Sequence, residues 1–241
     1  MVQHGPPRIL ALWSAPRCRS TAFLRMMGER GDFQVLHEPF SHVADFGATR
    51  VGDRRVGTEA ELIAALRALS ASGPVFFKDT TDFHYPVLLA DREFLAEVRH
   101  TFIIRHPREA IASHFALNPG LGRDEIGFAW LAEIFDAVVA AGGEPVVVDS
   151  DDLVENPEGT VRRYCAEVGI PFRPEALSWG PGMREEWAGT SRWHESTSRT
   201  SGFSRTATAY ARTTDNDPVL AGYLRHHLPF YERLRAHRLA V

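Results

Sequence analysis

The stretch "RILALWSAPRCRST" at residues 8–21 joins an apolar run to a polar loop. The run at 8–13 is short and almost continuously apolar, which predicts a strand covered on both faces. The loop leads into "STAFLRMMGER", which predicts a helix. Backbone N–H groups at a helix start and the positive end of its dipole favour an anion. Because Arg17 and Arg19 suit phosphate or sulfate oxygens, the stretch predicts an anion site between a strand and a helix.

The loop lacks the glycines and the Gly-Lys-Ser/Thr ending of a nucleoside triphosphate loop. That difference disfavours an ATP kinase or an ATPase. The hydroxyls of Ser20 and Thr21, at or near the helix start, add hydrogen-bond donors for phosphate oxygens. The alternative interpretation is an ordinary strand-to-helix turn with surface arginines, and the loop alone leaves both open.

Four further runs rich in β-branched or aromatic residues follow, at 33–37, 74–78, 101–105 and 145–149. Helix-like stretches occupy residues 20–30, 59–70, 91–99, 107–117 and 123–141. This alternation predicts an α/β fold with a parallel β-sheet flanked by helices. Pro107 and Pro157 each predict the first residue of a helix. Ligands of such sheets bind at the carboxyl ends of the strands.

Composition limits the class of protein. The chain has 241 residues, 44% of them hydrophobic, which predicts a single domain over 1–241. A formal charge of -4 disfavours nucleic acid as a partner. The first eight residues do not resemble a signal peptide, and no run approaches the roughly 20 apolar residues of a membrane span. We therefore expect no membrane partner and a cytoplasmic location. Only two cysteines occur, Cys18 and Cys165, so we expect no disulfide scaffold, which suits the same reducing compartment.

Residues 180–217 differ in character from the rest, being dense in Gly, Ser, Thr and Arg. The segment is too long for a routine connection, so it is either a functional lid or substrate loop, or a poorly ordered excursion. The last segment, 218–238, looks helical, and Pro229 predicts a break in it. No internal repeat is present.

A second constellation lies in "TFIIRHPREAIASHF", residues 101–115. Arg105 ends the predicted strand, and Ser113 follows eight residues later inside the next helix. An Arg at a strand end and a Ser on the following helix can converge on one phosphate. Carboxyl ends of parallel strands share one edge of the sheet, so this pair is expected beside the loop at 14–21.

These motifs resemble those of the nucleotide-dependent sulfotransferases, which transfer a sulfuryl group from 3′-phosphoadenosine 5′-phosphosulfate (PAPS). "SAPRCRST" looks like the family's loop for the donor's 5′-phosphate, and "RHPREAIAS" looks like its 3′-phosphate motif. A third similarity covers residues 146–172. The resemblance implies a P-loop NTPase-like fold of three α/β/α layers, no metal requirement, and adenosine 3′,5′-bisphosphate (PAP) as the product.

The resemblance also implies a donor site. Its 5′ side would be surrounded by Arg17, Cys18, Arg19, Ser20 and Thr21, and Arg105 with Ser113 would hold the 3′-phosphate. Many members have Lys where Arg17 stands. An arginine is essentially always charged, so Arg17 is expected to be an electrostatic clamp and no proton source. Cys18 and Arg19 stand where Ser and Gly are common, and the alternative for them is that only their backbone amides bind.

Transfer to a hydroxyl requires a general base. Glu38, in "VLHEPF", is the first candidate, because a similar Glu-Pro occurs in the family's carbohydrate branch and a Glu after this strand is the base in its tyrosyl-protein branch. The alternative for Glu38 is a solvated loop carboxylate. His37 competes as the base, since an unperturbed histidine titrates near neutrality.

Lys78, in "FFKDTT", resembles the family's lysine that stabilises charge on the transferring sulfuryl group and its bridging oxygen. Other members place a base histidine two residues after this lysine, where this chain has Thr80. The alternative for Lys78 is a surface ion pair with Asp79 or Asp82.

The late polar segment is expected to complete the site, since family members cover the adenine end of the donor with such a loop. Candidates for that contact are Arg199, Ser201 and Gly202. His194 is expected to be an ordinary exposed histidine, and the alternative is that it faces the acceptor. The aromatic residues of the segment either line an apolar acceptor pocket or anchor the loop to the core: Trp187, Trp193, Phe203 and Tyr210.

The sequence thus predicts an enzyme that transfers a sulfuryl group from PAPS to a hydroxyl or amine of a small-molecule acceptor. Glu38 is the expected base, and Arg17 and Lys78 are expected to stabilise developing charge. One alternative is an ATP-dependent phosphotransferase on the same fold, which would need magnesium. Another is a non-catalytic nucleotide-binding module. Neither the acceptor nor the oligomeric state follows from the sequence.

Overall fold

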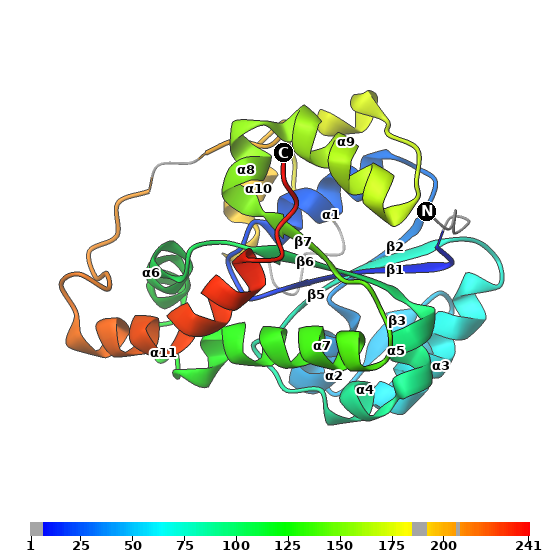
Figure 1. Cartoon of the computed structure of the whole chain (residues 1–241), viewed down its shortest axis with the longest axis horizontal. Helices are drawn as coiled ribbons and strands as arrows, with labels where there is room; N and C mark the ends of the chain where they lie inside the picture. The colour runs from blue at the N-terminus through cyan, green and yellow to red at the C-terminus, as the bar shows by residue number, and fades with distance from the viewer. Residues whose placement is uncertain (1–6, 185–191, 206–207) are drawn as a thin grey trace.

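A five-stranded parallel sheet forms the centre of the computed structural model, which describes residues 7–184, 192–205 and 208–241. The strand order is β2-β5-β1-β6-β7, so β1 lies in the middle (Figure 1). The strands are β1 (Ile9–Ser14), β2 (Gln34–His37), β5 (Val75–Thr80), β6 (Arg99–Ile104) and β7 (Val146–Asp149). All five lie where the apolar runs predicted them, and the predicted α/β class with a parallel sheet is confirmed.

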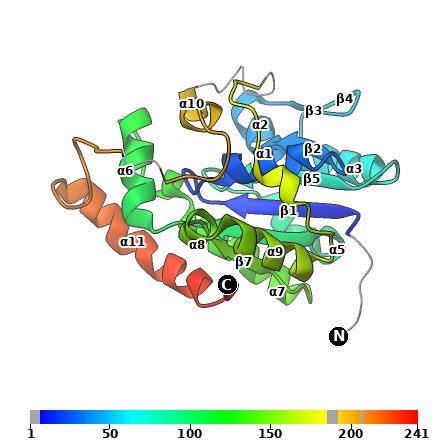
Figure 2. The ribbon, with the colours of Figure 1, turned by 90° about the horizontal axis from the view of Figure 1, so that it is seen from above.

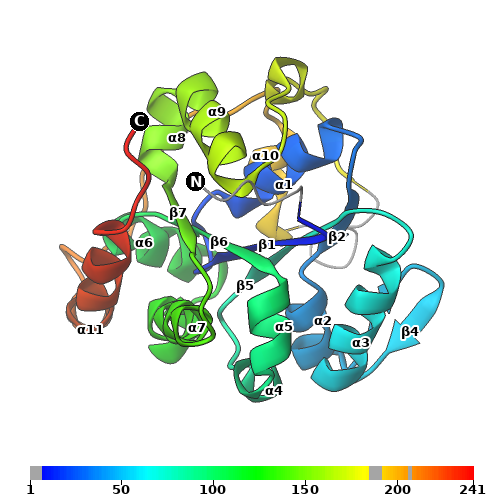
Figure 3. The ribbon, with the colours of Figure 1, turned by 45° about the vertical axis from the view of Figure 1, so that its right-hand side comes forward.

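Helices cover both faces of this sheet, which gives three layers (Figure 3). One face carries α1 (Ser20–Glu29), α8 (Ser150–Glu155) and α9 (Pro157–Val168). The other face carries α2 (Pro39–Phe46), α3 (Glu59–Ser70), α4 (Pro86–Ala90), α5 (Arg92–Glu97) and α7 (Phe128–Ala140). Alternate residues of β1 enter two separate cores, Leu10 and Leu12 on one side and Ala11 and Trp13 on the other. Burial on both faces explains the continuous apolar runs in the sequence.

The remaining elements lie around these layers. They are α6 (Pro107–Leu117), α10 (Glu195–Ser198), α11 (Pro218–Arg235), two 3-10 turns at Asp124–Ile126 and Pro174–Leu177, and a hairpin of β3 (Thr49–Val51) and β4 (Arg54–Val56). Figure 2 shows α6 and α11 side by side at one side of the molecule. Neither α2 nor the hairpin was predicted, since three-residue strands and an eight-residue helix are too short to show a period.

Two helix starts follow the prediction. α6 begins at Pro107 and α9 at Pro157. The side chain of Asn156 accepts a hydrogen bond from the Gly159 amide, which caps α9. Proline is favoured at such a first position because the missing N–H would have no partner inside the helix.

The predicted break at Pro229 is wrong, because α11 runs through this proline. An interior proline removes one backbone hydrogen bond. The helix packs against α6 and α7 and buries one face, including Leu220, Tyr231 and Leu234. Burial of that face outweighs the local cost of the proline.

No described helix is long and apolar enough to cross a bilayer. Trp187, one of the aromatic residues expected in the acceptor pocket, lies outside the described residues.

Candidate functional site

A cavity of about 770 Å³ is lined by residues that follow the carboxyl ends of β1, β2, β5 and β6, and by residues between 192 and 210. Of the predicted site residues, the cavity collects Arg17, Arg19, Ser20, Thr21, Glu38, Lys78, Arg105 and Ser113. The two motifs quoted from the sequence therefore face one space, as the shared edge of a parallel sheet requires.

The two phosphate-type motifs contact each other through Arg17. Its Nε donates to the Ser113 hydroxyl at 3.1 Å, and its Nη1 donates to the Trp193 carbonyl at 2.7 Å. Arg105 donates to the Arg17 carbonyl at 3.3 Å. Arg105 also forms an ion pair with Glu109, one turn along α6. Two guanidinium groups and one hydroxyl thus lie together at this end of the cavity, which we call the donor end.

The start of α1 lies in the same region. Arg19 is its N-cap residue in the left-handed conformation, with φ 65°, and makes no capping hydrogen bond with its side chain. The Ser14 hydroxyl donates to the Ser20 hydroxyl at 2.8 Å, and the Thr21 hydroxyl lies 3.4 Å from Nδ1 of His194. No described side chain accepts a hydrogen bond from the backbone of the first turn. The positive end of α1 is therefore available to an anion.

Cys18 and Arg19 place their side chains differently. The Cys18 side chain is fully buried in the core, and burial raises the pKa of its thiol to about 12. The Arg19 guanidinium donates to the Ser150 hydroxyl at 3.0 Å and forms an ion pair with Asp151 at 2.7 Å. The Arg19 guanidinium also lies 3.8 Å from Glu109, the partner of Arg105, and lines the cavity. Only the backbone of Cys18 is therefore left to face the loop.

Glu38 and Lys78, which line the same cavity, form an ion pair. Lys78 is 1% exposed, so the expected alternative of a surface pair with Asp79 or Asp82 is wrong. Burial by itself would raise the pKa of the Glu38 carboxyl. Lys78 and then His37 outweigh it and hold that pKa well below its ordinary range. Glu38 is therefore an ionised, partly buried carboxylate and no solvated loop residue.

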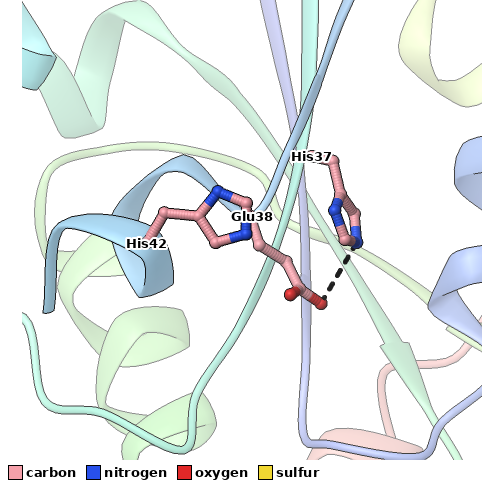
Figure 4. Close-up of side chains that lie close together, drawn as sticks. All are labelled: His37, Glu38 and His42. Carbon is pink, nitrogen blue, oxygen red and sulfur yellow. Dashed lines mark ion pairs between the residues drawn. The ribbon is translucent and has the colours of Figure 1, made fainter. Parts of the chain in front are cut away.

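Histidines surround this carboxylate. The Nε2 atom of His37 lies 3.5 Å from Glu38 Oε1, as the dashed line in Figure 4 marks. The ring centroids of His37 and His194 are 4.8 Å apart. His194, expected to be exposed, is 3% exposed, and burial first and the neighbouring His37 second lower its pKa to about 3. The polar sequence around His194 gave no sign of burial, because only tertiary folding brings α10 against His37.

His37, Glu38 and His42 also place potential ligand atoms within 4.8 Å of one another (Figure 4). A metal ion there would share Glu38 Oε1 with the Lys78 ammonium, and the two cations would repel each other. The arrangement is better matched to an internal ion pair than to a metal centre.

The aromatic residues expected around an acceptor divide between two settings. Trp193, Phe203 and Tyr210 all line the cavity. Phe203 also packs edge-on against the buried Trp179, with ring centroids 5.3 Å apart. Trp193 lies over α6, where its ring meets His114. Trp193 and Phe203 therefore both line the cavity and anchor the late segment to the rest of the protein.

Sequence reasoning missed two acidic residues near Glu38. Asp79 is fully buried, and burial raises its pKa to about 7. Asp82 lines the cavity, and burial together with the nearby Glu38 raises its pKa to about 6. Asp79 and Asp82 entered only as surface partners in the alternative interpretation of Lys78, and the run "KDTTD" holds no signal that separates buried from exposed carboxylates.

Comparison with known proteins gives one family match and two curated relatives. The family model described as "Sulfotransferase domain" matches residues 7–238. Branched-chain-amino-acid aminotransferase-like proteins 2 and 1 of Arabidopsis thaliana are each 28% identical, over 246 and 247 residues. The alignments cover 95% and 96% of this chain and 42% of each relative, so the chain spans less than half the length of these proteins.

Similar solved structures include the sulfotransferase domain of the Synechococcus PCC 7002 olefin synthase, with a TM-score of 0.49 and 17% identity over 98% of both chains. Retinol dehydratase in a complex with retinol and PAP has a TM-score of 0.45 and 12% identity, over 99% of this chain and 84% of the other. Because the family model covers nearly the whole sequence, the chain belongs to the sulfotransferase domain family.

Proposed function

We propose that this protein is a sulfotransferase that uses PAPS as its donor and a hydroxyl or amine of a small molecule as its acceptor. The observation that carries the proposal is the placement of the two phosphate-type motifs and the Glu38–Lys78 pair around one cavity. Positive groups suited to two phosphates, and a carboxylate beside an ammonium, thus line the same cavity.

At the donor end, the N-terminus of α1 with Ser20 and Thr21 suits the 5′-phosphate. Arg17 adds a fixed charge there, and Cys18 and Arg19 contribute backbone amides. Arg105 and Ser113 suit the 3′-phosphate. Arg105 already pairs with Glu109, so a bound phosphate would share this guanidinium with that carboxylate.

The donor supplies the sulfuryl group, whose sulfur exchanges its bond to the bridging phosphate oxygen for a bond to the acceptor oxygen or nitrogen. Glu38 takes the acceptor's proton, and the Lys78 ammonium and Arg17 stabilise the negative charge left on the bridging oxygen. Paired with Lys78, the Glu38 carboxylate is a weak base. As the ammonium turns toward the developing charge, the carboxylate loses its partner and its affinity for a proton rises. His37, in contact with Glu38, is the alternative base.

The late segment is proposed as a lid or substrate loop over 180–217 within a single domain. Its described residues support this, because Trp193 and His194 contact Arg17 and His37 respectively. Ser178 and Gly202 form a β-bridge that ties the segment to the body of the protein. Arg199, Ser201 and Gly202 remain proposed contacts for the adenine end, and Arg199 and Gly202 line the cavity.

We also propose a cytoplasmic location. Cys18 and Cys165 are both free and buried, which suits a reducing compartment.

Calorimetry with PAP is the direct test of the donor site. We expect saturable binding, and no heat at millimolar PAP would overturn the proposal. Incubation with labelled PAPS and a panel of alcohols, phenols and amines then tests transfer. A protein that binds PAP without any acceptor-dependent turnover would be a non-catalytic module, and a magnesium-dependent rise in melting temperature with ATP would favour a phosphotransferase.

Glu38→Gln tests the base. Donor affinity should stay nearly unchanged while kcat falls by about 100-fold or more. Glu97→Gln, at an exposed carboxylate of α5, is the matched control and should leave both unchanged. Full turnover by Glu38→Gln would assign proton removal elsewhere, and the same measurements on His37→Gln would then test the alternative.

A further inference from the structure

Helix α2 starts in an unusual way. Glu38 is its N-cap residue, with φ 49° and ψ 48°, and its side chain makes no capping hydrogen bond. An N-cap residue normally has extended backbone angles, and its side-chain oxygen accepts a hydrogen bond from the first turn of the helix. Here the carboxylate lies beside His37 instead (Figure 4) and pairs with Lys78. The first turn of α2 therefore needs an acceptor from elsewhere in the chain.

Asp79, the residue after Lys78 in β5, supplies that acceptor. Its carboxylate accepts hydrogen bonds from the backbone N–H groups of Phe40 at 2.6 Å and Ser41 at 3.0 Å, and from the Ser41 hydroxyl at 2.6 Å. Its own neighbour Thr80 donates a fourth, at 3.0 Å. Four donors on one fully buried carboxylate fix both its position and the start of α2.

The order Lys78-Asp79 in a strand explains how β5 holds Glu38 from two directions. Successive side chains of a strand point to opposite faces. Lys78 reaches the Glu38 carboxylate, and Asp79 reaches the helix that begins directly after Glu38. The Glu38 N–H also donates to the Lys78 carbonyl at 2.7 Å. Backbone and side chain of Glu38 are thus both fixed by two consecutive residues.

A hydrogen-bonded shell supports Asp79. The Ser41 hydroxyl lies 3.1 Å from the Thr80 hydroxyl and 3.0 Å from the Tyr85 hydroxyl. Tyr85, 2% exposed, donates to the Thr80 carbonyl at 2.6 Å. Burying a carboxylate costs free energy of desolvation. Helices α5 and α11 are instead capped by the side chains of their own N-cap residues, Asp91 and Asp217.

We propose that Asp79 is a positioning residue that caps α2 in place of Glu38 and so releases the Glu38 carboxylate into the cavity. The inference rests on the proposed function, in which Glu38 is the base. It assigns to Asp79 no contact with the substrate.

Asp79→Asn tests the inference, with Asp91→Asn as the matched control. Both variants weaken the cap of a helix, and Asp91 caps α5 outside the residues that line the cavity. In Asp79→Asn an amide N–H2 faces backbone donors, so α2 shifts and Glu38 moves relative to Lys78. We expect kcat to fall at least 10-fold with the Kd for PAP within about twofold, whereas Asp91→Asn keeps both.

The pH dependence gives a readout that a purely structural cap would not change. In the wild type, Lys78 holds the pKa of Glu38 well below its ordinary range. In Asp79→Asn that pKa should rise toward its ordinary value, which moves the acid limb of kcat to higher pH. The same shift should appear in the ¹³C NMR signal of the Glu38 carboxyl, assigned by its absence from Glu38→Gln.

The NMR measurement separates failure of this inference from failure of the proposed function. A wild type that neither binds PAP nor transfers sulfuryl groups would overturn the proposed function, and the Glu38 titration would still decide the role of Asp79. An unchanged Glu38 pKa in Asp79→Asn overturns the inference. If Asp79→Asn does not fold, Ser41→Ala removes one of its four donors, and a threefold to tenfold loss of kcat with the same direction of pKa shift is expected. Unchanged values in Ser41→Ala overturn the inference.

Discussion

Helices α1 and α2 begin in the same way and end up with opposite chemistry. Each follows a strand end of the central sheet, and each has a left-handed, non-glycine residue at its N-cap, Arg19 and Glu38. The first turn of α2 is filled by the buried carboxylate of Asp79. No described side chain fills the first turn of α1.

The difference shows how one local geometry serves two roles around a single cavity. An N-terminus without an internal acceptor can take an external anion, so α1 suits a phosphate. An N-terminus that already holds a carboxylate cannot, and the freed Glu38 side chain pairs with Lys78 instead. Left-handed backbone at Arg17, Arg19 and Glu38 costs of order 1 kcal/mol or more at each residue. Glycine would relieve that strain and lose the side chains.

The largest effect is expected from giving α1 an internal anion of its own. Thr21→Asp places a carboxylate in the first turn, where it should compete with and repel a bound phosphate. We expect the Kd for PAP to rise by about 100-fold or more in calorimetry. Thr21→Asn, of the same shape without the charge, should cost less than about 10-fold. Equal losses in the two variants would show that charge at the α1 start is unimportant.

A smaller loss is expected from removing one guanidinium at the donor end. Arg105→Ala deletes a charged donor that lies between Glu109 and the Arg17 carbonyl. The Kd for PAP should rise by about 10- to 100-fold, because one charge-assisted contact is lost. Arg108→Ala removes an exposed arginine that pairs with Asp215 on the surface and should leave PAP affinity unchanged. A retained affinity in Arg105→Ala would contradict its assignment to the 3′-phosphate.

His194 lies where the two helix starts meet, beside Thr21 and against the His37 ring. Its pKa is lowered to about 3 by burial, so the folded protein holds it neutral while the unfolded chain takes up a proton below about pH 6.5. Its contribution to stability is therefore present above pH 6.5 and is lost as the pH falls toward 3.

His194→Gln should make urea denaturation less sensitive to acid than in the wild type. Between pH 6.5 and 5, the slope of the free energy of unfolding against pH should fall by up to about 1.4 kcal/mol per pH unit relative to the wild type. An unchanged slope would mean that His194 is accessible to protons in the folded state.

The smallest effect is expected at the αL position of α1. Arg19→Gly relieves the left-handed strain at φ 65° and loses the ion pair with Asp151. These changes oppose each other, so the free energy of unfolding should stay within about 1 kcal/mol of the wild type. PAP affinity should change less than about threefold if Arg19 contributes only its backbone amide. A tenfold loss would place its guanidinium on the donor.

Much of the fold and of the donor end could be predicted, because local pattern and chain order are enough for them. Five apolar runs gave the five parallel strands, and Pro107 gave the start of α6. Arg105 and Ser113 were expected beside the loop at 14–21, because carboxyl ends of parallel strands share one edge. The Arg17–Ser113 hydrogen bond is the contact that joins them.

The surroundings of Glu38 and Lys78 could not be predicted to the same depth. A surface ion pair was the alternative for Lys78, whereas His194 was expected to be exposed and α11 to break at Pro229. Each of these depends on which distant segment covers the residue. Burial outweighs local polarity for His194 and local propensity for Pro229, and a single sequence shows only the local part.

The sequence by itself determined the α/β class, the order of strands and helices, and the residues that gather at the donor end. These follow from residue type and position along the chain, through the period of apolar residues and the geometry of strand-to-helix turns. Only the tertiary structure decided that Lys78 pairs with Glu38, that Asp79 caps α2 and that His194 is buried. Such choices depend on desolvation and on hydrogen-bond partners from segments far apart in the chain, and both exist only once the layers have packed.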